Sequence, residues 1–128
     1  MSKAFKPTES ELEILSILWE KGNATVREVH NIIFQTKEIG YTTTLKLMQI
    51  MHEKGMVSRD VSSKTHIYVP NFEQTKAQEQ YVSKIIKTLF SGSTSQLVLQ
   101  ALGNHQPSNS DLKEIKDLIT ELEKKVQH

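Results

Sequence analysis

The stretch Gly40-Tyr-Thr-Thr-Thr-Leu-Lys-Leu-Met-Gln-Ile-Met-His-Glu-Lys-Gly55 decides the fold of this chain. Two glycines bracket a run of helical length, and glycine often ends a helix because it readily adopts the left-handed conformation. Thr42 and Thr43 are expected to cap the start, since a threonine oxygen can accept a hydrogen bond from a free amide of the first turn. We therefore predict a helix over residues 42–54.

The predicted helix has an apolar face and a polar face. At roughly 100° per residue, Thr44, Leu47, Met48 and Met51 fall on one side, and Thr42, Lys46, Gln49 and Glu53 fall on the other. The first face suits a hydrophobic core. The second is short and rich in hydrogen-bonding groups, as is required of a helix that enters a DNA major groove. Ordinary surface helices share this pattern, so the neighbouring elements must decide.

Two helices are expected before this one. Thr8 with Glu11, and Thr25 with Glu28, have the spacing of a capping box, in which each side chain satisfies a free amide beside the other. Apolar residues follow each box at helical spacing. They are Leu12, Leu15, Ile17, Leu18 and Trp19, with Ile14 at the flank, and then Val26, Val29, Ile32 and Ile33, with Phe34 beside them. Trp19, the single tryptophan, is expected in the core.

A β-hairpin is expected after Gly55. Residues 56–61 alternate in polarity, residues 62–64 form a polar turn, and residues 65–69 are rich in β-branched and aromatic side chains before Pro70. Three helices followed by a hairpin, with a polar face on the third helix, is the order of a winged helix-turn-helix. The hairpin is the wing.

Residues 72–128 are expected to form three helices with apolar faces. The second ends at Gly103, and the third is capped by Ser108 or Ser110 and carries apolar residues at heptad-like spacing. This region would bury little by itself, and twofold dimers are the commonest assembly, so we predict a homodimer. The alternative is that it packs back on the first part as one larger monomer. The predicted dimer contacts are Tyr81, Ile85, Leu89, Leu97, Leu112, Ile115, Ile119 and Leu122.

The expected fold class is therefore mainly α with a small β-hairpin. A winged-helix DNA-binding domain is predicted over residues 1–71 and a three-helix dimerisation domain over residues 72–128. The absence of cysteine excludes disulfides and thiolate metal sites. No apolar stretch approaches the roughly 20 residues of a membrane helix, and the first residues lack the apolar part of a signal peptide. A cytoplasmic protein without membrane insertion is expected.

No catalytic site, metal site or cofactor is predicted. The five histidines are His30, His52, His66, His105 and His128, and they are scattered without the spacing of metal ligands. Phosphate-binding loops and nucleophile or zinc-protease motifs are also absent. Each histidine is therefore expected to be a surface or capping residue.

DNA binding is the function that the residues favour. Residues 41–70 hold the only basic excess, with four Lys or Arg against two Asp or Glu. Thr42 and Thr43 would lie near a phosphate or base edge, and Lys46 and Gln49 would reach bases. Tyr41 would contact phosphate or pack at the helix entry. Three hairpin residues, Arg59, Lys64 and His66, would meet the flanking backbone, although for Arg59 and Lys64 ordinary solvated charge is an equal alternative. The rival function is a winged helix that binds a protein.

Several segments, taken in order, resemble the penicillinase-repressor family, the BlaI/MecI/CopY type of bacterial transcriptional regulators. They are residues 13–19, 24–29, 41–43, 53–55, 68–70, 89–93 and 96–99. The resemblance covers roughly residues 8–124. It implies a winged helix, a helical dimerisation domain and a homodimeric repressor that binds a palindromic double-stranded DNA operator. Thr42 and Thr43 match the threonine pair at the start of the family's recognition helix.

The chain also departs from the family pattern. Thr44, Lys46 and Ile50 stand where valine, threonine and arginine are usual, so a different base preference is expected. In the β-lactam branch a membrane sensor-protease triggers cleavage at an Asn-Phe bond, and the corresponding residues here are Gln100-Ala101. The cysteine-rich tail of the copper-responsive branch is missing. The resemblance therefore implies relief by a sensor-protease of altered specificity, or by another signal.

Overall fold

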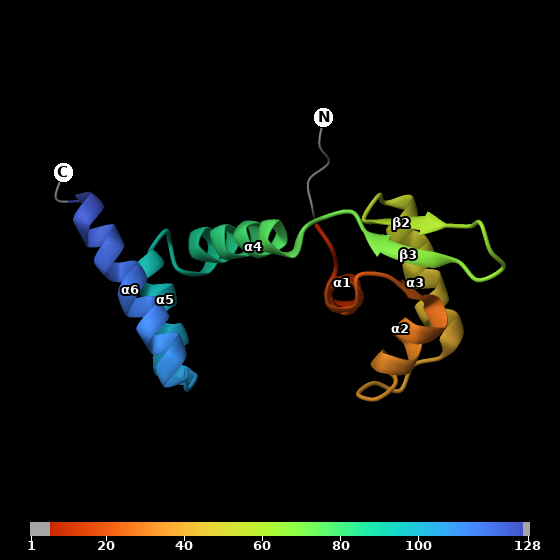
Figure 1. The fold of residues 1–128 in the computed structure, drawn as a ribbon, viewed down its shortest axis with the longest axis horizontal. Helices are drawn as coiled ribbons and strands as arrows, with labels where there is room; N and C mark the ends of the chain where they lie inside the picture. Colours follow the sequence, from red (N-terminus) through yellow and green to blue (C-terminus); the bar gives the residue numbers. More distant parts are fainter. Residues whose placement is uncertain (1–5, 127–128) are drawn as a thin grey trace. The chain divides into compact units, whose positions relative to one another are not determined.

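A computed structural model describes residues 6–126, and Figure 1 shows its elements. They are α1 (Glu9–Lys21), β1 (Ala24–Thr25), α2 (Val26–Ile33), α3 (Tyr41–Glu53), β2 (Val57–Asp60), β3 (Ile67–Pro70), α4 (Gln74–Leu89), α5 (Thr94–Asn104) and α6 (Asn109–Val126). The expected fold class is confirmed, since three helices and a small antiparallel sheet build a winged helix-turn-helix ahead of three further helices. His128 lies outside the described residues.

The chain divides into two compact units, one ending at Tyr81 and one beginning at Val82. The sequence placed a boundary at residues 71 and 72, whereas the first unit extends into α4. Two contacts account for this extension. Ala77 is 4% exposed, and the Tyr81 hydroxyl donates a hydrogen bond of 3.2 Å to the Pro7 carbonyl.

The sheet has three strands rather than the two of the predicted hairpin. Its order is β1-β3-β2, and both pairings are antiparallel. Tyr68 on the central strand pairs with Ala24 on one side and with Arg59 on the other. Sequence reasoning missed β1 because two residues are too short to show an alternating pattern. This strand ties the start of α2 to the wing.

Both predicted capping boxes are present. Thr8 Oγ1 accepts a hydrogen bond from the Glu11 amide at 3.2 Å, and the Glu11 carboxylate accepts one from the Thr8 amide at 2.8 Å. Thr25 and Glu28 repeat this exchange at 3.1 and 2.9 Å. Four free amides at two helix starts are thus satisfied by residues three positions apart, which is why the short sequence pattern was sufficient.

The predicted cap of α3 is wrong. Gly40 is the N-cap residue, with an extended backbone and no side-chain cap bond, and the helix begins at Tyr41. Thr42 and Thr43 already have helical conformation in the first turn, so their hydroxyls do not cap it and their side chains are exposed. The predicted end is close to the observed one, because Lys54 is the C-cap and Gly55 follows with φ of 82°.

The core of the first unit is formed by α1, α2, α3 and the sheet. Its buried apolar residues are Ile14, Leu15, Leu18, Ala24, Val26, Val29, Ile33, Met48, Met51, Met56, Val57 and Tyr68. Ile14, expected at the flank of α1, is fully buried, whereas Ile32 on α2 is 36% exposed. On α2 the buried face takes Val26, Val29 and Ile33, and Ile32 points away from it. Trp19 is partly buried, and its ring nitrogen donates a bond of 2.7 Å to the Phe72 carbonyl.

His30 is buried, so the expectation that every histidine is a surface or capping residue is wrong. It is 8% exposed, and its Nδ1 lies 3.0 Å from Oγ1 of Thr44, which is itself fully buried in α3. A buried polar group needs a partner, and these two side chains satisfy each other. The bond joins α2 to the first turns of α3.

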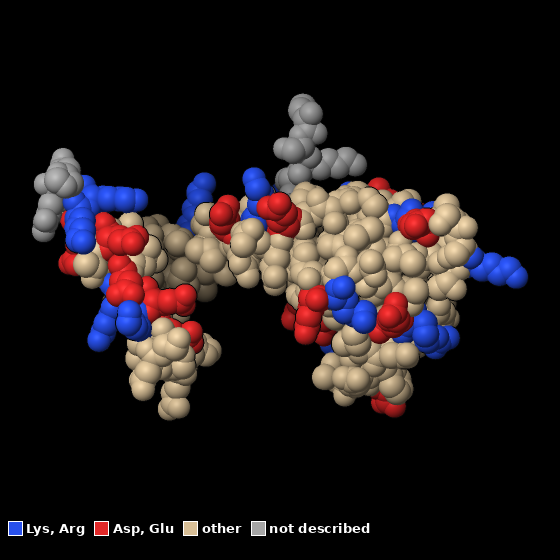
Figure 2. Space-filling view, viewed as in Figure 1, with Lys and Arg blue, Asp and Glu red and all other residues tan. Residues whose placement is uncertain are grey.

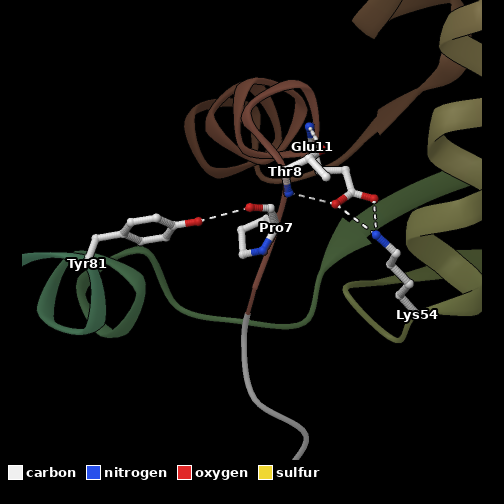
Figure 3. A network of polar contacts seen from close by, with 5 residues as sticks. All are labelled: Pro7, Thr8, Glu11, Lys54 and Tyr81. Carbon is white, nitrogen blue, oxygen red and sulfur yellow. Dashed lines mark hydrogen bonds and ion pairs between the residues drawn. The ribbon is translucent and has the colours of Figure 1, made fainter. Parts of the chain in front are cut away.

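A second polar network lies at the opposite end of α3 (Figure 3). The carboxylate of Glu11, 2% exposed, accepts two hydrogen bonds from Lys54 Nζ, at 2.8 and 3.1 Å. Burial, together with the nearby negative charge of Glu11, raises the pKa of Tyr81 above its ordinary value of 10.0, and the Tyr81 hydroxyl donates to the Pro7 carbonyl. The start of α1 is thereby joined to the end of α3 and, through the preceding Pro7, to the middle of α4.

In the second unit, neither α5 nor α6 has a buried side chain. Ser108, rather than Ser110, caps α6, since its hydroxyl accepts from the Asp111 amide at 3.0 Å. The α5 helix runs through Gly103 to Asn104, one residue beyond the predicted end. Within the described residues, no helix combines the length and the apolar character that crossing a membrane requires.

Candidate nucleic-acid interface

The outward face of α3 is polar and open. Thr42, Thr43, Lys46 and Gln49 are exposed, as the helical wheel predicted. Thr44, Met48 and Met51 lie on the inward face and are fully buried. The core contacts therefore fix the rotation of the helix and direct its hydrogen-bonding residues away from the protein.

Beside this face lies a hollow of about 310 Å³, which we call the wing groove. It is lined by Thr25, Val26, Arg27, Tyr41, Leu45, Gln49, Arg59, Lys64, Thr65, His66 and Tyr68. The start of α2, one side of α3 and the hairpin each contribute residues to it. The groove thus brings together five of the eight predicted DNA-binding residues. The other three, Thr42, Thr43 and Lys46, are on exposed parts of α3 outside this lining.

The groove is basic, and its cations lack ion pairs. Its described lining contains Arg27, Arg59 and Lys64 and no Asp or Glu. None of these three, nor Lys46, forms an ion pair with a described residue. Over the face of the first unit seen in Figure 2, by contrast, basic and acidic side chains are interspersed.

Three cations elsewhere in the first unit have carboxylate partners. Lys21 pairs with Glu28, Lys37 with Glu13, and Lys54 with Glu11, at 3.7, 3.1 and 2.8 Å. The absence of such partners in the wing groove leaves its positive charge available to a ligand. A small net charge of +1 for the whole chain therefore hides a local excess.

Two acidic residues near these elements accept hydrogen bonds from backbone amides close to them in the sequence. The Thr25 backbone amide, through its hydrogen bond, holds the pKa of Glu28 below its ordinary value, and the Ser62 amide does the same for Asp60. The Asp60 bond, 2.9 Å long, closes the turn that follows β2. Both carboxylates therefore serve a helix start or a turn.

Sequence reasoning missed Arg27. Its guanidinium carbon lies 4.1 Å from the centre of the Tyr41 ring, a cation–π contact between α2 and α3. The Tyr41 ring also packs nearly perpendicular to the buried His30 ring, with centres 5.6 Å apart. The Thr25–Glu28 capping box already placed Arg27 in the first turn of α2, but only the packing of α2 against α3 brings it to the groove.

These features define a class of protein. A winged helix with an exposed polar third helix and an adjacent unpaired basic groove is a DNA-binding regulator. The comparison with protein families specifies the class further. A family model described as "Penicillinase repressor" matches residues 7–121, nearly the whole chain.

Curated relatives agree with this match. The penicillinase repressor of Staphylococcus aureus is 22% identical over 124 residues, which cover 97% of this chain and 98% of that protein. The penicillinase repressor of Bacillus licheniformis is 21% identical over 121 residues, which cover 94% of each. The methicillin resistance regulatory protein MecI of Staphylococcus aureus strain N315 is 20% identical over 118 residues, covering 92% and 96%. The chain belongs to the penicillinase-repressor family, a family of transcriptional repressors and not of enzymes.

Proposed function

We propose that this protein is a homodimeric repressor that binds a palindromic operator with α3 of each subunit in the major groove. The observation that carries the proposal is the exposed polar face of α3 beside a basic groove without ion pairs. A helix fits the major groove, where every base pair presents a distinct pattern of donors and acceptors. The operator lies on cytoplasmic DNA.

The proposal assigns different tasks to different residues of the interface. Lys46 and Gln49 read bases, since lysine suits the acceptors of guanine and glutamine can pair with adenine. Thr42 and Thr43, in the first turn of α3, bring hydroxyls and free helix amides to a phosphate. Contacts of the hairpin with the flanking backbone position the protein without reading sequence.

The second unit supports the dimer part of the proposal. No side chain of α5 or α6 is buried, and large apolar residues remain open on both helices. Those exposed by at least 36% from residue 85 onward are Ile85, Leu89, Val98, Leu99, Leu112, Leu118, Ile119, Leu122 and Val126. Apolar patches of this kind mark association surfaces. A second copy would cover them and would place two α3 helices on half-sites about 34–36 Å apart.

Selection of bound genomic DNA fragments tests the DNA part. Recovery of one motif with dyad symmetry is expected. On that motif, Lys46→Ala and Gln49→Ala should weaken binding in gel shifts at matched salt, whereas Lys37→Ala, a paired cation away from the groove, should not. Parent-like binding by both α3 variants would show that α3 is not the reading helix. Failure to enrich any DNA would favour a protein-binding winged helix.

Light scattering tests the assembly. The full chain should have twice the mass of one subunit, and removal of residues 104–128, which include α6, should yield a monomer. An unaltered dimer after this truncation would exclude α6 from the interface. One of the predicted dimer contacts, Tyr81, also has a contact within the first unit, because its hydroxyl donates a hydrogen bond to the Pro7 carbonyl.

Relief of repression is proposed to follow cleavage by a membrane sensor-protease. The Gln100–Ala101 bond lies in α5, and both residues are exposed. Proteases bind extended backbone, so cleavage requires local opening of this helix. An immunoblot of induced cells should show a fragment that ends near residue 100. A full-length repressor that leaves its operator on induction would point to another signal.

A further inference from the structure

We propose that the wing groove binds one backbone phosphodiester of DNA and that Arg27 is its principal ligand. This inference rests on the proposed DNA-binding function and adds a residue of α2 to the interface. Arg27 stands on α2, whereas the residues predicted from the sequence stand on α3 and the hairpin. Its side chain is exposed and lines the groove.

Ring contacts support the Arg27 side chain. The guanidinium lies over the Tyr41 ring at 4.1 Å, and that ring packs nearly perpendicular to the His30 ring, with centres 5.6 Å apart. His30 is in turn bonded to the buried Thr44. A continuous set of contacts therefore runs from the core to the guanidinium. Stacking occupies one face of the planar group and leaves its N–H edges free, which is the geometry that binds phosphate bidentately.

Arg59 supplies a second cation from the other side of the groove. It is opposite Tyr68 in the sheet, and Tyr68 is also opposite Ala24 in β1. Because α2 starts directly after β1, the sheet fixes the spacing between the elements that carry Arg27 and Arg59. The Nε atom of Arg59 is shielded from solvent and has no hydrogen-bond partner among the described residues.

This shielded N–H is a donor that an acceptor entering the groove could satisfy. A buried donor without a partner is unfavourable, and such a group in a folded protein calls for a ligand or water that satisfies it. A phosphate oxygen in the groove would supply the acceptor and would be attracted by Arg27, Arg59 and Lys64. The groove lining offers no described carboxylate to compete for these groups.

The position of the groove favours DNA as the source of this phosphate. Gln49, which faces bases in the proposed complex, lines the same hollow as the two arginines. A phosphate bound there is therefore adjacent to the bases that α3 reads. A free phosphate would present the same chemistry, so the experiment must separate the two sources.

The experiment measures the affinity of the full chain for the selected operator over a range of salt concentrations. Arg27→Ala should weaken binding about tenfold. It should also reduce the slope of log K against log salt by about 0.9, the value for one neutralised phosphate. Arg27→Lys should keep the slope and lose part of the affinity, because an ammonium group lacks the planar fork. Lys21→Ala, a nearby cation paired with Glu28, should leave both quantities unchanged.

Neutral methylphosphonate substitutions in the operator locate the contact. One substitution should weaken binding by the parent and have no further effect on Arg27→Ala. Circular dichroism of each variant verifies that it is folded. An Arg27→Ala variant with the parent's affinity and salt slope, on an operator that the parent binds, overturns this inference and leaves the proposed function intact.

Titration with inorganic phosphate alone tests whether the groove binds free phosphate in the absence of DNA. The parent should show no saturable shift of backbone amide resonances at residues 25–27 in the absence of DNA. Saturable binding at millimolar phosphate, with DNA affinity insensitive to Arg27→Ala, would make the groove a free-anion site and would overturn the proposal. Failure of the parent to bind any selected DNA would remove the proposed function and this inference together.

Discussion

Replacing Lys54 by methionine should destabilise the first unit by about 2 kcal/mol at neutral pH. The Glu11 carboxylate, 2% exposed, accepts two hydrogen bonds from Lys54 and one from the Thr8 amide (Figure 3). The substitution removes two of these three bonds. Loss of one partner of a buried ion pair costs about 3–5 kcal/mol. The Lys54 side chain is 44% exposed, so water can replace part of the lost interaction, and the expected cost falls below this range to about 2 kcal/mol.

The destabilisation should depend on pH. Burial by itself raises the pKa of Glu11, but the hydrogen bonds from Lys54 and Thr8 outweigh it and hold the pKa below its ordinary value of 4.5. A lowered carboxylate pKa stabilises the fold above the pKa of the unfolded chain, and this contribution is lost as the pH falls through the folded value. The difference between the parent and Lys54→Met should therefore be full at pH 7 and shrink below about pH 4.

Urea unfolding followed by Trp19 fluorescence measures this effect. Trp19 is the single tryptophan and lies in α1, so it reports on the first unit. Glu11→Gln and the double variant complete a mutant cycle, in which a coupling energy of at least about 0.5 kcal/mol is expected. The reasoning is refuted if Lys54→Met unfolds at the parent's urea midpoint at pH 7, or if the loss of stability is the same at pH 3.

Three further changes test the packing of α3. Met48→Ala should lower the free energy of unfolding by about 2–5 kcal/mol, since this side chain is fully buried; a loss below 1 kcal/mol would contradict its core position. Thr44→Val should cost about 1–3 kcal/mol, because it removes the partner of His30, whereas Thr44→Ser should restore most of the stability. Gly55→Ala should cost about 1 kcal/mol through its φ of 82° alone, as an added Cβ meets nothing within 4 Å. Urea midpoints measure all three.

Local patterns in the sequence were sufficient for several parts of the fold. The two capping boxes involve side chains only three residues from the amides they bind, so no distant residue decides them. The rotation of α3 was also predictable, because helical geometry alone separates Met48 from Gln49. Turn residues and β-branched runs located the wing for the same reason.

Other features depended on contacts between distant residues. Capping physics favoured Thr42 and Thr43 as the start of α3, but Gly40 takes the extended conformation and the helix begins one residue earlier. Strand β1 exists only because β3, more than forty positions later, pairs with it. The burial of His30 required its partner Thr44, fourteen residues away in α3.

The sequence by itself determined the class of this protein, since element order, helix faces and the run of motifs already indicated a winged-helix regulator of the penicillinase-repressor type. The tertiary structure decided which side chains share the interface. Arg27 and Arg59 are 32 positions apart, and the pairing of β1 with β3 and of β3 with β2 brings both into the wing groove. The physical reason is that periodicity and caps act within a few residues, whereas a binding groove forms only when separate elements pack together.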